Sequence, residues 1–363
     1  MRHSSNGVGG YRGRRTAHDV LKIIAIVLGI LVVLALAALL LGQRYIVYGD
    51  DGIRLETPFS QEDDKEKPVD PDDIQVEDAS SIPAPDKDKE DKPKPEKKPT
   101  KKTMSAVEVP ISAVLDGSAD QLAKDASANT IVVEMKNREG MLNFVSAQPV
   151  AQASGVSSST ANINQTITDW NKGDRYTIAR VVCFADNAAP YNQNSVALRA
   201  SYGNWRDVNK LRWMDPTNNL AQEYMIGLCQ ELAQMGFDEI LLEYAGCPTE
   251  GNLEAVQYAS NDAAAALSGE NGFLSRVKAA LAPTQTKLSV ETTLEAIQGT
   301  VSDGGLTAAG LNQYADHIWL TGDRAAAVQA MTAAGFTEPE SKLVVSAGAL
   351  AKDAEGHQAQ LAG

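Results

Sequence analysis

Residues 104–363 of this chain are predicted to fold as a (β/α)8 barrel with an incomplete or irregular eighth unit. Apolar runs rich in β-branched residues alternate there with helical patterns, which is typical of a parallel sheet covered by helices. Seven such runs occur, one fewer than a complete barrel has. The alternative is a doubly wound open sheet. The turn after the first run, 115–118, lacks the Gly-x-Gly-x-x-Gly pattern of a dinucleotide site, so no nucleotide cofactor is expected.

The predicted strands and helices follow one another regularly. The expected strands are, in order, 107–115, 130–136, 176–184, 239–244, 288–291, 317–320 and 343–346. The expected helices are 118–126, 220–235, 253–267, 272–282, 306–314 and 325–334. Asp215-Pro216 is expected to open the second of these helices and Gly236 to close it. After Leu350 only 13 residues remain, too few for an evident eighth strand and helix.

An uninterrupted apolar run precedes the barrel. Residues 23–41 are 19 consecutive residues without a polar or charged side chain. As a helix they would span about 28 Å, close to the hydrocarbon thickness of a bilayer. We therefore expect a single-pass anchor in the lipid bilayer over residues 23–42, in the cell membrane. Basic residues dominate segment 1–22, which predicts a cytoplasmic N-terminus and an extracellular barrel. A cleaved signal peptide is the alternative, but its apolar core would be only about 7–15 residues long.

Two different segments connect the apolar run to the barrel. Residues 43–60 place a Gly-Asp-Asp-Gly turn between two short apolar runs, which indicates an extracellular hairpin. Residues 61–103 hold 14 acidic residues, 10 lysines and 7 prolines, and no aromatic residue. Such a segment buries too little apolar surface to offset the entropy of ordering it. It is predicted to be a disordered, solvated linker.

Charge and the scarcity of metal-binding residues exclude several function classes. The chain has 33 Lys and Arg against 47 Asp and Glu, a formal net charge of -14, so nucleic acid is not an expected partner. The four histidines are scattered and show no ligand spacing, so no metal and no cofactor are predicted. The three cysteines are too few for a disulfide scaffold, although Cys183 and Cys247 could pair.

Polar side chains gather on the inward faces of the predicted strands, near the ends where barrel enzymes carry their chemistry. In chain order they are Glu134, Lys136, Arg180, Asp186, Glu243 and Glu291, with Trp319 on the sixth strand. Buried charges are costly unless they are paired or functional. The group therefore predicts either the mouth of an active site or a layer of internal ion pairs, such as Lys136 with Glu134 and Arg180 with Glu243.

Aromatic residues are concentrated after the third predicted strand. Tyr191, Tyr202, Trp205 and Trp213 lie within one connecting segment. Sugar rings have apolar faces that stack on aromatic rings, and carboxylates with nearby cations are what a carbohydrate cleft requires. Each tryptophan taken alone is better explained by simple packing, so the aromatic group supports a polysaccharide partner only together with the charged residues.

Four segments together resemble a bacterial family of glycoside hydrolase-like barrels of uncharacterised activity, whose members are commonly membrane-anchored or secreted. The segments are ANTIVVEMKNREGML (128–142), YTIARVVCFAD (176–186), YGNWRDVNKLRWMDPTNN (202–219) and AQMGFDEILLEYAGCP (233–248). The resemblance covers most of residues 105–350 and implies a (β/α)8 barrel with glycosidase activity. Positions that match the family pattern are Lys136, Arg180, Asp186, Trp213, Asp215, Pro216, Asp238 and Glu239.

The chain departs from this family in two places. Glu134 and Glu243 stand where the family usually has aspartates. Gly246 and Cys247 stand where the family has an arginine and a phenylalanine. Loss of a cation beside an acid would alter the pKa of that acid and remove a substrate contact.

Two functional hypotheses follow. The first is a membrane-tethered glycoside hydrolase that acts on a cell-wall or environmental polysaccharide through two carboxyl groups. Glu243 is the first candidate, and Glu291 or Asp186 the second. The residues expected to bind the polysaccharide are Glu134, Lys136, Arg180, Trp205, Trp213 and Trp319. The second hypothesis is a non-catalytic barrel that binds envelope polysaccharide or protein, which the loss of the arginine and phenylalanine favours.

Overall fold

The computed structural model describes residues 46–49, 52–55, 103–300, 304–352 and 354–361, and the chain divides into two compact units, 1–94 and 95–363. In the first unit, strand β1 (Ile46–Gly49) pairs antiparallel with β2 (Gly52–Leu55). The expected cytoplasmic tail, membrane helix and nearly all of the charged linker lie outside the described residues. Among the residues that are described, no helix is both long and apolar enough to cross a bilayer.

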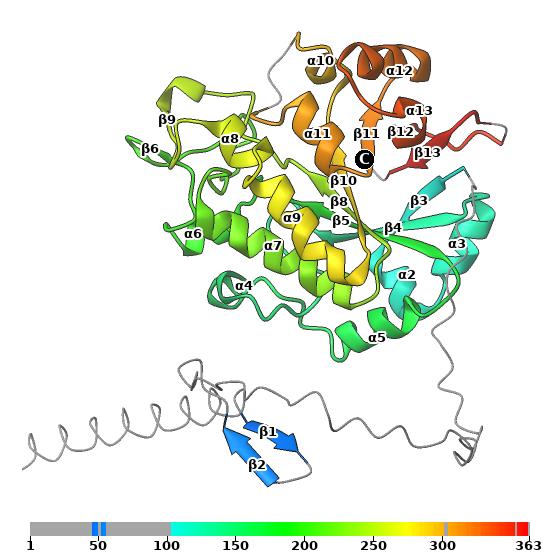
Figure 1. Cartoon of the computed structure of the whole chain (residues 1–363), viewed down its shortest axis with the longest axis horizontal. Coiled ribbons are helices and arrows are strands. Elements are labelled where there is room, and N and C mark those ends of the chain that lie inside the picture. The colour runs from blue at the N-terminus through cyan, green and yellow to red at the C-terminus, as the bar shows by residue number, and fades with distance from the viewer. Residues whose placement is uncertain (1–45, 50–51, 56–102, 301–303, 353, 362–363) are drawn as a thin grey trace, which may run out of the picture. The chain divides into compact units, whose positions relative to one another are not determined.

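The second unit is a closed barrel of eight parallel strands surrounded by helices (Figure 1). In order around the barrel, the strands are β3 (Ser105–Val109), β4 (Thr130–Lys136), β5 (Tyr176–Val182), β8 (Glu239–Glu243), β10 (Lys287–Glu291), β11 (His317–Thr321), β12 (Leu343–Ser346) and β13 (His357–Gln360). The predicted (β/α)8 class is confirmed. The open doubly wound alternative is wrong, because β13 pairs with β12 on one side and with β3 on the other.

The eighth strand was not expected from the sequence. β13 reads His-Gln-Ala-Gln and contains no β-branched residue, so it lacks the usual strand signal. Hydrogen bonds to its two neighbouring strands hold this segment in the β conformation, although its own residues have little strand propensity. β13 closes the barrel, so the eighth strand is present.

The outer helices have the following bounds. They are α2 (Ile111–Asp116), α3 (Ala119–Asp125), α4 (Pro149–Ser154), α5 (Ile163–Trp170), α6 (Ala188–Asn192), α7 (Asn219–Gln234), α8 (Ala263–Ser268), α9 (Phe273–Leu281), α10 (Leu294–Ile297), α11 (Ala308–Tyr314), α12 (Arg324–Ala333) and α13 (Pro339–Lys342). Short strands β6 (Arg199–Ala200), β7 (Gly203–Asn204) and β9 (Val256–Gln257) form a separate sheet, and η2 (Leu253–Ala255) and η3 (Ala282–Thr284) are single 3-10 turns.

Three predicted boundaries are wrong for local reasons. The first strand stops at Val109, because Pro110 has no N–H for the ladder and caps the short helix α2 instead. The predicted helix 253–267 is interrupted by β9, and only its last part is α-helical. Helix α7 begins at Asn219, where the Asn218 side chain accepts hydrogen bonds from the backbone, rather than at Asp215-Pro216. Gly236 does follow the helix end, with a positive φ of 93°.

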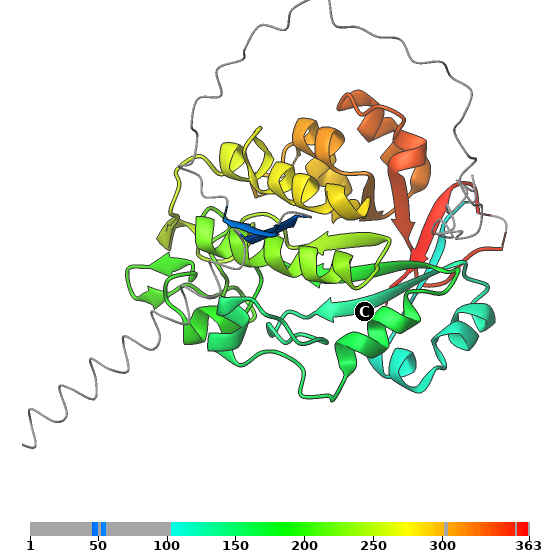
Figure 2. The ribbon, with the colours of Figure 1, turned by 60° about the horizontal axis from the view of Figure 1, so that its bottom comes forward.

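The hydrophobic core has two layers, one on each side of the barrel wall. The larger layer lies between strands and helices, and Figure 2 shows helices from the cyan and green parts of the chain on one side and yellow and orange helices on the other. The smaller layer fills the barrel interior. It consists of Met104, Ala106, Val132, Ile178, Leu241, Trp319, Val344 and Ala359. This inner plug separates the two ends of the barrel, so chemistry at one end is isolated from the other.

A buried polar cluster closes the N-terminal end of the barrel. The Glu239 carboxylate accepts hydrogen bonds from Tyr176 (2.7 Å) and Ser289 and pairs with His317 (3.0 Å). Burial alone would raise the pKa of Glu239, but the charge and hydrogen bond of His317, with those of Ser289 and Tyr176, lower it to about 2. Because every acceptor is satisfied and the cluster lies at the end opposite the expected mouth, we assign it a structural role.

Candidate active site

One arginine and three glutamates interlock at the C-terminal end of the barrel. Arg180 of β5 donates through Nε to Glu243 of β8 (2.7 Å) and through one terminal nitrogen to Glu108 of β3 (2.8 Å) and Glu134 of β4 (3.2 Å). The Arg180 side chain is 17% exposed, whereas those of Glu108 and Glu243 are 6% and 4% exposed. The strand ends therefore bring three carboxylates from three strands onto a single cation.

A fourth carboxyl group makes this cluster unusual. Glu291, which ends β10, forms a side-chain hydrogen bond with Glu243. Burial, then the nearby charge of Glu243, raises the pKa of Glu291 to about 7, against the opposing charge of Arg180. Two carboxyl groups in contact cannot both be ionised cheaply, so Glu291 keeps its proton up to a pH of about 7 and, when protonated, donates a hydrogen bond to Glu243.

The charges of this cluster also shift the pKa values of Glu134 and Arg180. Burial raises the pKa of Glu134, Arg180 opposes this, and the charges of Glu108 and Glu243 reinforce it. Burial would lower the pKa of the Arg180 guanidinium, but the hydrogen bonds and charges of Glu243 and Glu108 outweigh it and raise that pKa. The arginine therefore stays charged. The result is a carboxylate that pairs with Arg180, Glu243, next to an acid with a raised pKa, Glu291, which is the pairing that acid-assisted bond cleavage needs.

An aromatic residue adjoins this pair and was not identified from the sequence. Tyr244 follows Glu243 directly, has a positive φ of 48° and leaves 42% of its surface exposed. The guanidinium of Arg138 lies over its ring, 4.8 Å from the centroid, and the Trp213 ring meets it edge-on at 5.8 Å. Non-glycine residues rarely adopt a positive φ, and such strain is concentrated at functional sites. The sequence signal that could have identified Tyr244 was its position directly after the glutamate that ends β8.

The two neighbours of Tyr244, Arg138 and Trp213, are held by one carboxylate. Asp207 accepts from Arg138 (2.6 Å) and from the Trp213 indole (3.1 Å). Its pKa is lowered, since these bonds and those from the backbone outweigh the effect of burial. Trp213 is only 5% exposed, so it supports Tyr244 from behind. Of this aromatic pair, Tyr244 is the residue with surface available to a ligand.

The structure places Lys136 and Asp186 elsewhere than predicted. A register shift between Glu134 and Lys136 pairs Lys136 with Val181, whose side chain belongs to the outer core layer. The shift turns Lys136 away from the inward face that Glu134 keeps. Lys136 is fully buried and pairs with Asp186 at 2.8 Å, not with Glu134. Asp186 also accepts from two backbone N–H groups of α6, so neither side chain reaches the mouth.

The other predicted binding residues divide by exposure. Arg180 and Glu134 do lie in the mouth, and the expected Arg180–Glu243 ion pair is present. Trp205 and Trp319 have no exposed surface. Trp205 donates its indole N–H to the Asn252 carbonyl oxygen (2.8 Å), and Trp319 belongs to the plug inside the barrel. In this conformation neither ring offers a face to a sugar.

A glycine packs tightly against the buried ion pair, which gives a test of how rigid this region is. Gly140 has φ of 89°, and a Cβ there would collide with the Asp186 carboxylate. We expect Gly140→Ala to lower the free energy of unfolding by about 2 kcal/mol, from backbone strain and from the clash. Urea unfolding of the full chain measures this. Gly117→Ala is the matched control, because Gly117 has a similar φ of 82° with nothing within 4 Å. Equal losses in both variants would show that the Asp186 contact is unimportant.

Metal and thiol chemistry find no support in the residues that the structure describes. Within them, no group of three or more His, Cys, Asp or Glu is arranged to hold a metal ion. The three cysteines are free and buried, so the possible Cys183–Cys247 disulfide is absent. Burial raises the pKa of each thiol, which makes them inert rather than nucleophilic.

Comparison with solved structures gives distant likenesses. A hypothetical protein from Ruminiclostridium thermocellum is 23% identical, with 51% of this chain and 96% of that chain covered and a TM-score of 0.39. The PgaB (BpsB) glycoside hydrolase domain from Bordetella bronchiseptica is 11% identical, with coverages of 68% and 84% and a TM-score of 0.49. An exo-β-N-acetylglucosaminidase from Vibrio harveyi is 11% identical, with coverages of 67% and 41% and a TM-score of 0.44.

Comparison with curated protein sequences returned no significant match. A family model does match: residues 110–315 fit the model described as "putative glycosyl hydrolase domain". This segment runs from α2 to the end of α11 and contains Arg180, Glu134, Glu243 and Glu291 of the mouth. The match covers more than half of the chain and agrees with a closed barrel that carries paired carboxyl groups at its C-terminal end. The chain therefore belongs to this glycosyl hydrolase family and has a glycosidase-like barrel.

Proposed function

We propose that this barrel hydrolyses a glycosidic bond of a polysaccharide, with Glu291 as the general acid and Glu243 as its ionised partner. The observation that carries the proposal is the Glu243–Glu291 contact at the strand ends. Burial and the neighbouring Glu243 raise the pKa of Glu291 to about 7, while Glu243 is paired with Arg180. An acid with a pKa near the working pH transfers its proton most effectively.

The proposed reaction uses these two groups in sequence. Glu291 gives its proton to the glycosidic oxygen as the bond between that oxygen and the anomeric carbon breaks. Positive charge then develops on the sugar ring and is stabilised by the Glu243 carboxylate. A water molecule adds its hydroxyl to the anomeric carbon and returns its proton to Glu291. Arg180 stays charged throughout and positions Glu243.

The free protein holds the pair closer than working glycosidases do. Carboxyl groups in such enzymes are about 5–5.5 Å apart when configuration is retained and about 6.5–9.5 Å apart when it is inverted. Here they are in hydrogen-bond contact. A bound sugar must therefore enter between them and take over the proton that Glu243 accepts in the empty site. Tyr244, exposed beside the pair, offers that sugar an aromatic face.

We further propose that the enzyme works outside the cell, tethered to the membrane, on a cell-wall or environmental polysaccharide. The support is the 19-residue apolar run at 23–41, the basic residues before it and the charged, proline-rich segment after it. Protease treatment of intact cells tests the tether. Barrel fragments should be released into the medium, whereas protection until the cells are lysed would refute the extracellular placement.

Release of new reducing ends from polysaccharides tests the hydrolase. The full chain and its Glu243→Gln variant should be incubated with bacterial wall glycans and with α- and β-linked polysaccharides. We expect release by the wild type and a loss of about 10²–10⁴-fold in the variant, because Gln cannot stabilise the developing positive charge.

Glu340→Gln is the matched control, since Glu340 lies exposed on α13, which precedes β12 at the opposite end of the barrel. Its activity should equal that of the wild type. No release from any glycan by any form would overturn the hydrolase. Retention of a glycan without release would favour the non-catalytic binding barrel, for which the replacement of the family arginine and phenylalanine by Gly246 and Cys247 is the supporting observation.

A further inference from the structure

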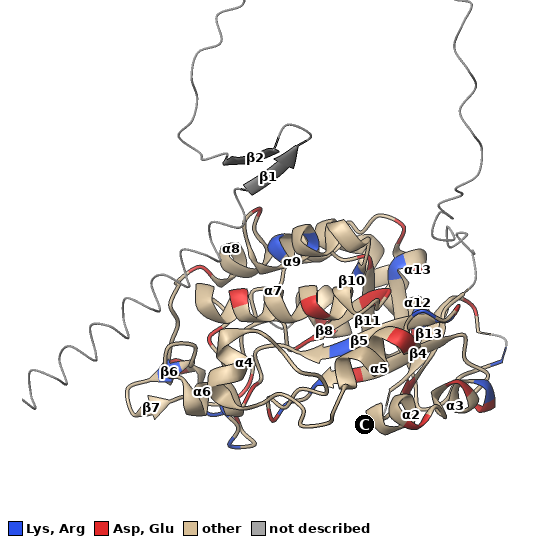
Figure 3. Cartoon of the chain, turned by 90° about the horizontal axis from the view of Figure 1, so that it is seen from below, with Lys and Arg blue, Asp and Glu red and all other residues tan. Residues whose placement is uncertain are grey.

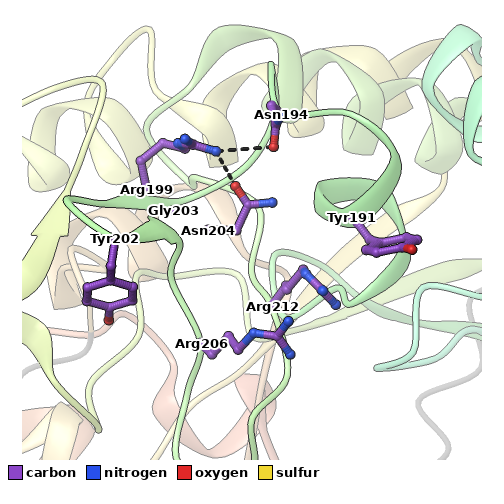
Figure 4. Close-up of a pocket in the computed structure, with 8 residues that line it drawn as sticks. All are labelled: Tyr191, Asn194, Arg199, Tyr202, Gly203, Asn204, Arg206 and Arg212. Carbon is purple, nitrogen blue, oxygen red and sulfur yellow. Dashed lines mark hydrogen bonds between the residues drawn. The ribbon is translucent and has the colours of Figure 1, made fainter.

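A cavity of about 430 Å³ lies in the long connection between β5 and α7. Its lining residues are Tyr191, Asn194, Arg199, Tyr202, Gly203, Asn204, Arg206 and Arg212 (Figure 4). β6 and β7 form one wall, and in Figure 3 β6 carries basic colour beside α6. Three arginines around one cavity are unexpected in a chain whose net charge is -14.

None of these guanidinium groups pairs with a carboxylate among the residues that the structure describes. Arg199 donates to the Asn194 side chain (3.1 Å) and to that of Asn204. Arg206 donates to the backbone carbonyl of Lys210 (3.0 Å). All three acceptors are neutral, so the charges of these two arginines are left without compensation.

Arg212 has the same kind of surroundings. It donates to the Asn187 side chain (3.0 Å) and lies over the Tyr191 ring, 4.7 Å from the centroid. Arg206 and Arg212 also face each other across an antiparallel backbone bridge. Like charges directly opposite on paired strands repel and destabilise the pairing. An anion placed between the two guanidinium groups would turn this repulsion into attraction.

The cavity also has features that suit a sugar. Tyr191 and Tyr202 are 67% and 63% exposed, in contrast to the buried tryptophans of the same segment. Exposed aromatic rings offer stacking faces, and the flat fork of arginine suits carboxylate and phosphate groups. Aromatic faces and unpaired guanidinium groups in one cavity fit a glycan that carries negative charges.

A continuous set of contacts joins the cavity to the mouth. Arg206 precedes Asp207, which holds Arg138 against Tyr244, and Tyr244 follows Glu243. The connection that forms the cavity starts at the C-terminal end of β5, at the same barrel end as the carboxyl pair. A polymer lying along this face could therefore reach both places.

We propose that this cavity binds a carboxylate or phosphate group of an anionic polysaccharide, whose chain extends to the Glu243–Glu291 pair. The extension to the mouth rests on the proposed hydrolase function, whereas binding of the anion does not. The arginine pair Arg206 and Arg212 contacts the anionic group, and the exposed tyrosines contact the sugar faces. The substrate class of this barrel is accordingly an acidic glycan rather than a neutral one.

Calorimetry with short glycans tests this directly. The full chain is titrated with a galacturonic acid trimer, a glycerol phosphate trimer and a neutral galactose trimer. We expect at least one anionic trimer to bind at least about tenfold more tightly than the neutral one, and the tighter of the two identifies the group recognised. Equal affinity for all three, or no binding of any, would overturn the proposal.

Variants then locate the binding. In Arg206→Gln/Arg212→Gln the preference for the anionic trimer should fall at least about tenfold, and Arg206→Lys/Arg212→Lys should recover part of it by restoring the charge. Lys124→Gln/Lys172→Gln is the matched control, which removes two exposed charges at the N-terminal end of the barrel. An unchanged preference in the arginine variant would place the anion elsewhere and refute the cavity.

The two proposals fail separately. Selective binding of an anionic trimer without any release of reducing ends would leave the cavity standing and refute the hydrolase. Release of reducing ends with no preference for charged glycans would leave the hydrolase standing and refute the cavity.

Discussion

Replacing Glu291 by glutamine should greatly lower the activity and, above neutral pH, stabilise the fold. Gln cannot donate the proton that the leaving oxygen needs, so we expect kcat to fall about 10²–10⁴-fold. For the wild type, release of reducing ends should decline as pH rises through about 7, because Glu291 then loses its proton. The measurement is the rate of reducing-end release for both forms between pH 5 and 9.

The stability change follows from the raised pKa of Glu291. Between its ordinary value of 4.5 and the folded value of about 7, the folded state binds more protons than the unfolded state. Linkage therefore makes the free energy of unfolding of the wild type fall as pH rises through this range. Glu291→Gln removes that loss, so its urea midpoint should exceed that of the wild type at pH 8 and lie closer to it at pH 5. The Glu340→Gln control should follow the wild type at both pH values.

A Glu291→Gln variant that is inactive but also less stable at pH 8 would contradict this account. It would mean that the glutamate is held there by favourable contacts and is not a strained acid. Gain of stability on loss of an active-site group is the ordinary sign that the group is kept for function.

Replacing Arg180 by methionine should destabilise the barrel by about 3–5 kcal/mol at pH 7. The change leaves Glu108, Glu134 and Glu243 close together without their shared cation, and uncompensated buried charges are costly. Arg180→Lys keeps the charge but loses the fork that reaches several carboxylates, so its loss should be smaller. Urea unfolding at pH 7 and pH 4 measures both variants.

The pH dependence separates charge from packing in this experiment. Burial raises the pKa of Glu134, so this carboxyl group takes up a proton as the pH falls to 4 and needs less compensation, and the difference between Arg180→Met and wild type should narrow. A difference of equal size at both pH values would show that lost packing of the long arginine side chain causes the effect. In that event Arg180 would not be the electrostatic centre of the mouth.

Much of the fold could be predicted because strand patterns are local. The strand 130–136 and the strand 343–346 have the predicted bounds, and β5, β8 and β10 differ from prediction by only one or two residues. The strands β4 and β5 are almost entirely buried and rich in β-branched residues, so their signal does not depend on neighbouring segments. The strand that the sequence missed, β13, has the opposite character, since it is held by its two neighbours rather than by its own composition.

The candidate site was predictable only in part. The prediction that side chains alternate along a strand correctly placed four residues at the mouth: Glu134, Arg180, Glu243 and Glu291. It succeeded because side chains of successive residues point to opposite faces. The same rule failed for Lys136, where a register shift within β4 reverses the alternation. A bulge depends on how two strands pair, so the sequence of one strand does not reveal it.

The sequence by itself determined the barrel class, the order of its elements and the inward-facing charges that distinguish this chain. Only the tertiary structure decided which charges meet, that Glu291 hydrogen-bonds with Glu243 rather than standing apart from it, and that Lys136 and Asp186 pair below the surface. It also separated the aromatic segment into buried tryptophans and exposed tyrosines. The physical reason is that side-chain direction is set by the local backbone, whereas ionisation and exposure are set by charges and surfaces that distant segments bring into contact.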